Sequence, residues 1–179
     1  MKRTMAVSIL ALTFSLTAFA QTQQAPVTLR SVLLQQLKNA HNQAEWYAPI
    51  SVAVDGLTAE QASWQPPKGA HSAGQLTYHL LFWNRQSLMR LSGQTPDKFS
   101  GDNEQTFSKF DAKQWSDIVK QLDQVLTDME KLVETANDQK LAAIAPTVAK
   151  IATHNAYHDG QIIYVRKLQG SWNPDKGVK

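Results

Sequence analysis

Three histidines carry the most distinctive chemistry in this sequence. His154 and His158 are four residues apart, so on a helix both imidazole rings leave the same face. His79 lies upstream in an apolar stretch, beside Leu80 and Trp83. Burying an unpaired imidazole costs about 1–3 kcal/mol, and one divalent metal ion can satisfy several rings at once. Three neutral imidazoles with an open fourth position are typical of a catalytic zinc-type site.

The spacing alone also permits other interpretations. A core histidine is more often satisfied by a hydrogen bond than by a metal, so three hydrogen-bonded core histidines are the alternative. No glutamate follows His154, so the His-Glu-x-x-His helix of zinc peptidases, with its general base, is absent. His71 and His41 are interpreted as a loop residue and a residue at the edge of the first helix. The candidate metal ligands are therefore His79, His154 and His158.

Further residues are expected to orient these ligands. A metal-ligating histidine usually donates its second N–H to an oxygen atom. Side-chain oxygens near the three histidines are carried by Gln75, Asn155, Asp159 and Gln161. The sequence does not distinguish among these four.

Four helical segments must position the histidines. Apolar residues recur at alternating intervals of three and four, which is the pattern of a core-facing helix. Capping-box pairs predict helix starts at Ser72 and Asp111 and a short helical turn after Thr58, and Pro146 suits the first turn of the last helix. The fold class is therefore all-α, a four-helix bundle with long connections between helices one and two and between helices two and three. The predicted helices span residues 29–54 (kinked at Pro49), 72–93, 111–136 and 146–169.

The beginning of the chain has the pattern of a cleaved secretory signal peptide. Lys2 and Arg3 precede an apolar run over residues 5–16 that is too short to span a membrane, and small residues follow up to Ala20. The mature protein is expected to be periplasmic or secreted. The predicted organisation is a signal peptide over residues 1–20, a polar linker over 21–27, a bundle domain over 28–171 and a C-terminal tail over 172–179.

Composition limits the partners. The 179 residues suit one domain, and removing Lys2 and Arg3 leaves 16 basic residues against 15 acidic ones. No basic cluster stands beside exposed aromatic residues, so we expect no nucleic-acid partner, and no membrane partner after signal cleavage. The chain contains no cysteine, which excludes disulfides, thiolate metal sites and cysteine nucleophiles. The expected partners are a small-molecule substrate and a second copy of the chain in a homodimer.

Two stretches are similar to family signatures. Residues 64–83, which contain His79, and residues 154–161, which read His-Asn-Ala-Tyr-His-Asp-Gly-Gln, resemble the signatures of the DinB-like superfamily. The similarity extends over nearly all of the mature chain. It implies a four-helix bundle in up-down-down-up order that binds a divalent metal, commonly zinc or nickel, through three histidines. Those ligands fall here on His79, His154 and His158.

The resemblance implies several activities. Members of the superfamily include thiol-dependent transferases, a maleylpyruvate isomerase that uses a low-molecular-weight thiol, and many proteins with no assigned reaction. An oxidising compartment is a poor place for a reduced thiol, so the export signal argues against a thiol cosubstrate. The sequence therefore predicts a metal-dependent enzyme of hydrolase type that activates water for attack on an unknown small substrate. The alternatives are a non-catalytic periplasmic metal-binding or interaction bundle and a thiol-dependent S-transferase.

The signal peptide leads to a direct prediction. Mass spectrometry of the protein from its native host should find Gln21 as the first residue, in the exported fraction, because signal peptidase cuts after the small residue Ala20. A mature protein that retains Lys2 and Arg3 would contradict the prediction.

Overall fold

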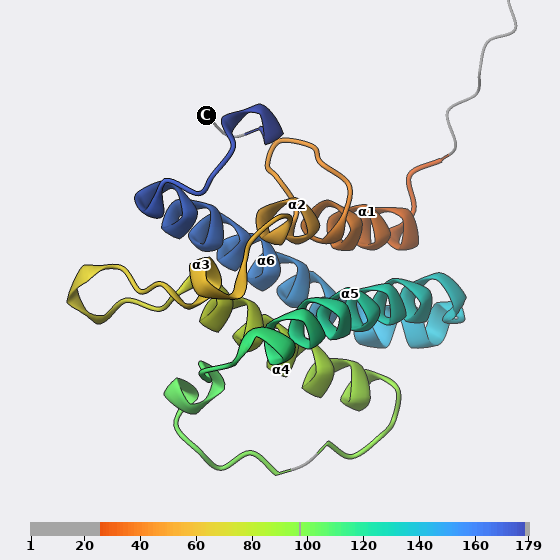
Figure 1. Cartoon of the computed structure of the whole chain (residues 1–179). Coiled ribbons are helices and arrows are strands. Elements are labelled where there is room, and N and C mark those ends of the chain that lie inside the picture. The colour runs from red at the N-terminus through yellow and green to blue at the C-terminus, as the bar shows by residue number, and fades with distance from the viewer. Residues whose placement is uncertain (1–25, 97, 178–179) are drawn as a thin grey trace, which may run out of the picture.

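Helices dominate the structure, which is a computed structural model that describes residues 26–96 and 98–177. The predicted all-α class is confirmed for that part of the chain, and the predicted signal peptide lies outside it. Among the described helices, none is both long and apolar enough to cross a membrane. The long helices are α1 (Leu29–His41), α4 (Ala73–Leu91), α5 (Ala112–Thr135) and α6 (Asp138–Gln169), and the short ones are α2 (Ile50–Val54) and α3 (Ala59–Ser63) (Figure 1).

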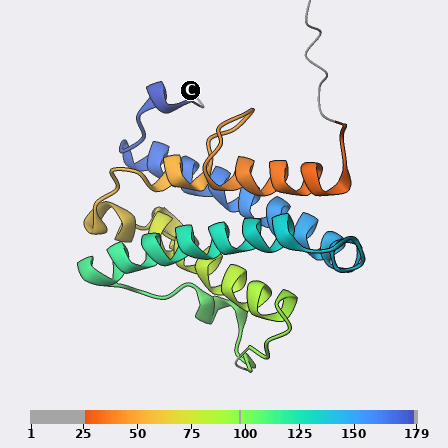
Figure 2. The same cartoon turned by 90° about the vertical axis from the view of Figure 1, so that its right-hand side faces the viewer.

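The four long helices contact one another in a ring. Both α1 and α4 pack against α5 and α6, and Figure 2 shows α1 and α5 running alongside each other. Two clusters of buried apolar side chains fill the interior, one around α4 and the start of α5, the other beneath α1 and the start of α6. Direct contact between α4 and α6 allows side chains of these two helices to meet. The predicted apolar seam of α5 is buried at Trp115, Ile118, Leu122, Val125 and Met129.

Capping boxes start three helices where the sequence predicts them. The Ser72 hydroxyl accepts a hydrogen bond from the backbone N–H of Gln75, and the Gln75 side chain accepts one from the backbone N–H of Ser72. The same reciprocal pairs cap α3 at Thr58 and α5 at Asp111. Each pair satisfies backbone donors that the first helical turn leaves free. The start of α4, and with it the direction in which His79 points, is therefore set by local sequence.

The bounds predicted for the first helix are wrong. Residues 29–54 are not one kinked helix, because α1 ends at His41 and α2 begins only after Pro49. Proline lacks the backbone N–H that a helix interior needs, and it disfavours helical geometry at the preceding residue. The intervening loop leaves Ala44, a predicted seam residue, exposed to solvent.

The last predicted helix is also wrong at its beginning. It starts at Asp138 rather than at Pro146, because the Asn137 side chain accepts a hydrogen bond from the backbone N–H of Lys140 and caps an earlier turn. Pro146 lies inside α6 on an exposed face, where water can bond the carbonyl that lacks a partner. The helix ends where Gly170 takes the left-handed conformation, with φ of 77°. Leu168, predicted in the buried seam, is 52% exposed.

Arg166 joins the end of α6 to two other segments. Its buried guanidinium donates hydrogen bonds to the carbonyl oxygens of Ala53 (2.6 Å) and Ser171 (2.9 Å) and lies 5.4 Å from the centre of the Trp172 ring. Lys176, in the 3₁₀ turn Pro174–Lys176, forms an ion pair with Asp55. Residues 172–177, predicted as a tail, therefore contact the bundle.

An ion-pair cluster around the buried His41 holds α1 against α5. His41 is 2% exposed, and its Nδ1 and Nε2 atoms lie 2.7 Å from a Glu130 carboxylate oxygen and 2.9 Å from an Asp123 carboxylate oxygen. Burial lowers the pKa of His41, but the hydrogen bonds and charges of Glu130 and Asp123 outweigh it and raise that pKa above 6.5. Both ring nitrogens face acceptors, so the charged imidazolium is the form that fits.

This cluster predicts a pH-dependent contribution to stability. At pH 5.5, His41→Leu should lower the free energy of unfolding by about 2–4 kcal/mol, because two carboxylates lose a buried partner. The pKa of His41 is raised in the folded state, so its stabilisation is fully present below pH 6.5 and is lost as the pH rises through the folded-state value.

Urea unfolding of wild type and variant between pH 5.5 and pH 9 measures this directly. The difference between the two free energies of unfolding should shrink with rising pH. A difference that stays constant or grows would show that His41 is neutral in the folded protein.

Candidate metal centre

The three predicted ligands meet between α4 and α6. His79 comes from α4, and His154 and His158 come from consecutive turns of α6. The Nε2 atom of His154 lies 3.3 Å from Nε2 of His79 and 3.1 Å from Nε2 of His158. A tetrahedral ion with bonds of about 2.0–2.1 Å holds its ligand atoms about 3.3–3.4 Å apart. These two distances suit a single divalent ion, and the ligand atoms of all three histidines lie within 4.8 Å of one another.

Hydrogen bonds fix which nitrogen of His79 carries its proton. The Thr106 hydroxyl donates to the backbone carbonyl of Asn103 at 2.6 Å, and its oxygen lies 2.6 Å from Nδ1 of His79. Since the hydroxyl proton points to Asn103, the Thr106 oxygen accepts from the Nδ1–H of His79. A neutral imidazole with its proton on Nδ1 has a lone pair on Nε2. That lone pair faces the other two histidines.

The same reasoning applies to His158. Its Nδ1 atom lies 2.6 Å from the side-chain oxygen of Gln161. The amide nitrogen of Gln161 donates to the Tyr157 hydroxyl at 3.0 Å, and in this arrangement the amide oxygen faces His158. That oxygen can only accept, so the proton of His158 is on Nδ1 and its Nε2 carries a lone pair.

Hydrogen bonds among the three rings cannot satisfy all of their Nε2 atoms once His154 is included. A proton on its Nε2 atom can be donated to only one of the two neighbouring nitrogens. At least one of the facing Nε2 lone pairs on His79 and His158 is therefore left unmatched by the other two rings. A cation at the shared point accepts all three lone pairs, so the residues present fit a metal ion.

Electrostatics keep the three rings in the neutral form that binds metal. Burial, together with the nearby rings of His158 and His154, lowers the pKa of His79 to about 3. Burial and the nearby His154 ring lower the pKa of His158 to about 4, although its hydrogen bond to the Gln161 oxygen opposes the shift. Burial also lowers the pKa of His154. None of the three rings then competes for a proton at neutral pH.

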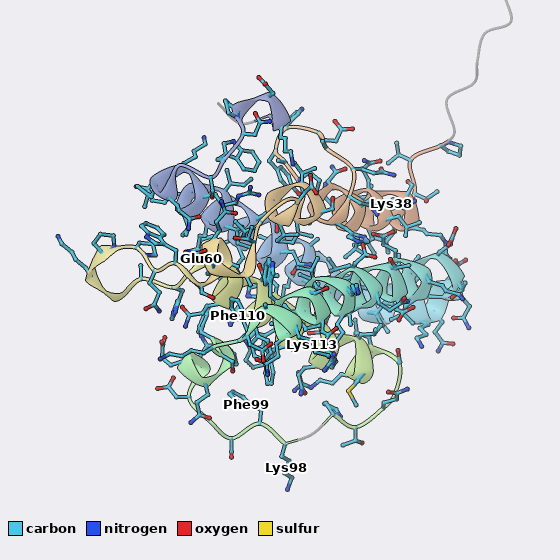
Figure 3. All side chains as sticks on the ribbon, viewed as in Figure 1. Lys38, Glu60, Lys98, Phe99, Phe110 and Lys113 are labelled. Atoms are coloured by element: carbon cyan, nitrogen blue, oxygen red, sulfur yellow. The ribbon has the colours of Figure 1, made fainter. Side chains whose placement is uncertain are left out.

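The connection between α4 and α5 forms one wall of the site. The Phe107 ring stacks on His79 with centroids 4.3 Å apart and on His71 with centroids 3.7 Å apart. Phe99 packs edge-on against Trp83, and Figure 3 shows its side chain pointing toward the bundle while Lys98 points away. The 3₁₀ turn Asn103–Thr106 lies in the same connection. A segment without long regular structure is thus held against His79 by ring contacts and the Thr106 hydroxyl.

An open cavity of about 550 Å³ adjoins the three histidines. Such a volume accommodates a small organic molecule. Trp83, Phe107 and Ile151 contribute apolar surface, and Asn84 and Asn103 contribute amide groups. A metal ion bound by three histidines would have its remaining coordination position available for a ligand from this side.

The four residues predicted to orient the histidine ligands have different roles in the structure. Gln161 does contact His158. Gln75 instead caps α4 and bonds Gln65, and Asn155 bonds Asn84 across the interface between α4 and α6. Asp159 is fully buried, and no hydrogen-bond partner contacts its carboxylate oxygens among the described residues.

Sequence reasoning missed Thr106, the hydrogen-bond partner of His79. It lies 27 residues from His79, in a segment that composition identifies only as a loop. Neither spacing nor periodicity connects the two positions. Its burial, unusual for a loop threonine, becomes visible only in the folded chain.

Comparison with known proteins adds one finding. The family model described as the DinB superfamily matches residues 44–162, about two thirds of the 179 residues. The matched segment contains all three histidines of the candidate metal centre. No curated protein and no solved structure matches the chain.

The hydrogen bond from His79 to Thr106 leads to a prediction. Thr106→Val keeps the shape of the side chain but removes the acceptor for the Nδ1–H of His79, so the ring is free to place its proton on Nε2. Zinc affinity, measured at pH 7.5 by competition with a chromophoric chelator, should fall about 10–100-fold. Thr106→Ser retains the hydroxyl and should bind zinc nearly as tightly as wild type. Equal affinities for the valine and serine variants would contradict this role for Thr106.

Proposed function

Since the chain belongs to the DinB superfamily, we propose that it is a metal-dependent enzyme of hydrolase type that acts on a small substrate. The ion would be held by His79, His154 and His158. The observation that carries the proposal is the convergence of three Nε2 atoms, two of which belong to rings whose Nδ1 atoms are hydrogen-bonded to Thr106 and Gln161. Neutral imidazole nitrogens suit zinc and nickel, which are the proposed metals.

The surrounding residues define what such a site can do. When bound, a divalent ion supplies Lewis acidity, which polarises a coordinated oxygen and lowers the pKa of coordinated water toward about 7. The chain itself holds the three rings neutral, directs their lone pairs to one point and offers an adjoining cavity for the substrate. Asn84 and Asn103 line that cavity with groups that can orient a polar substrate. No carboxylate lines it in the described part of the chain, which distinguishes the site from the His-Glu-x-x-His arrangement.

For the bundle we propose the up-down-down-up order of helices. In Figure 1 the colour runs along α4 and α5 in the same direction, and along α1 and α6 in the opposite one. The connection over residues 92–111 is long enough to return the chain to the end of the bundle where α4 began. This order places His79 of α4 beside the antiparallel α6.

Metal binding tests the first half of the proposal. Zinc or nickel at a hundredfold excess over the Kd should stabilise the folded protein by about 2.7 kcal/mol and raise its melting temperature at pH 7.5. The double variant His154→Ala/His158→Ala should lose this rise. The control His71→Phe keeps an aromatic ring against Phe107 and should retain it. An equal rise in wild type and the double variant would place the ion elsewhere.

Activity tests the second half. The metal-loaded protein, assayed against a panel of small esters, amides and phosphate esters, should hydrolyse members of one class, and His154→Ala should abolish that activity. Metal chelation should have the same effect, and adding zinc back should restore turnover. Tight metal binding without turnover of any panel member would contradict the hydrolase and favour a non-catalytic metal-binding bundle.

A further inference from the structure

The cavity beside the three histidines contains one charged side chain that the proposed metal site does not use. That residue is Lys150, which lies four residues before His154 on α6. Positions four apart on a helix are neighbours, with Cβ atoms about 5–6 Å apart. Lys150 therefore extends from the same face of α6 that carries the ligands.

Within residues 26–96 and 98–177, no carboxylate forms an ion pair with Lys150. Among the ion pairs of the described residues, those that involve lysine join Lys113 to Asp117 and Lys176 to Asp55, and none involves Lys150. The carboxylate of Glu104, in the nearby 3₁₀ turn, instead faces His71 at 3.6 Å. The ammonium group of Lys150 is thus available to a ligand.

The charges at the metal-loaded cavity would all be positive. Imidazole ligands carry no negative charge, so a divalent ion held by three of them would keep its charge uncompensated. Lys150 adds a further positive charge on the same side of the cavity. A cleft with charges of one sign and walls of low polarity concentrates ligands of the opposite sign. The site is therefore complementary to an anion and unfavourable to a cation.

The walls define the rest of the ligand. Trp83, Phe107 and Ile151 line the same cavity and can cover an apolar body. A second hollow, lined by Ala149, Lys150, Thr153, His154 and Tyr157, continues past Lys150 along α6. Lys150 and His154 border both spaces, so a group held by Lys150 lies beside the ligands of the metal.

We infer that the substrate is a small carboxylate with an apolar body, an inference that rests on the proposed metal site. Lys150 determines this specificity by forming an ion pair with the carboxylate. A carboxylate satisfies the unpaired ammonium group, and the apolar body displaces water from the three apolar walls. The neutral amide of the same acid matches the walls equally well but lacks the charge.

Calorimetric titration of the zinc-loaded protein tests the inference. The ligands are acetate, hexanoate and benzoate, each compared with its own amide at pH 7.5. Hexanoate and benzoate should bind at least about tenfold more tightly than their amides, and more tightly than acetate. Lys150→Gln should weaken binding of these two acids roughly tenfold while leaving amide and zinc affinities unchanged. Lys131→Gln, at an exposed position of α5 outside both hollows, should match wild type.

The outcomes separate this inference from the proposed function. Three results would overturn the role of Lys150 but leave the metal site standing, provided that the protein takes up zinc. They are equal affinities for acids and amides, no binding of any acid, and acid binding that Lys150→Gln does not change. Failure of the wild-type protein to take up zinc would overturn both. Turnover of neutral esters with no preference for substrates that carry a free carboxylate would also contradict the inference.

Discussion

The candidate site depends on one constraint, which is that three buried imidazole rings must stay neutral and direct their Nε2 lone pairs to the same point. Burial and the proximity of the other rings keep the imidazoles neutral, but they do not choose which nitrogen carries the proton. Thr106, whose own proton goes to the Asn103 carbonyl, accepts from Nδ1–H of His79, and the amide oxygen of Gln161 accepts from Nδ1–H of His158. If either tautomer were reversed, a proton would occupy the place of the ion.

The bundle supplies the positions that this constraint requires. The capping box at Ser72 sets where α4 begins, and the uninterrupted α6 presents His154 and His158 on consecutive turns. Contact between α4 and α6 then brings the rings together, while the connection between α4 and α5 closes over His79 through Phe107. Regular helices thus fix the ligands, and an irregular segment fixes the proton on one of them.

Much of this arrangement could be predicted from the sequence because its causes are local. Helix periodicity, capping boxes and the interval between His154 and His158 act within a few residues, and the predicted fold class and helix starts at Ser72 and Asp111 are confirmed. The extent of the first predicted helix is wrong because Pro49 separates α1 from α2 instead of kinking one helix. The predicted start of the last helix is wrong because the cap at Asn137 outweighs the preference of Pro146 for a first turn. The contact between Thr106 and His79 joins residues distant in sequence, and no local pattern encodes it.

X-ray absorption spectroscopy at the zinc edge of the metal-loaded protein is the most direct test of the converging histidines. We expect three imidazole nitrogens at about 2.0–2.1 Å and one further light ligand from the open side. His79→Ala, which leaves the pair on α6 intact, should reduce the imidazole count to two. A spectrum with one imidazole or none, or one that His79→Ala does not change, would contradict a metal centre built from His79, His154 and His158.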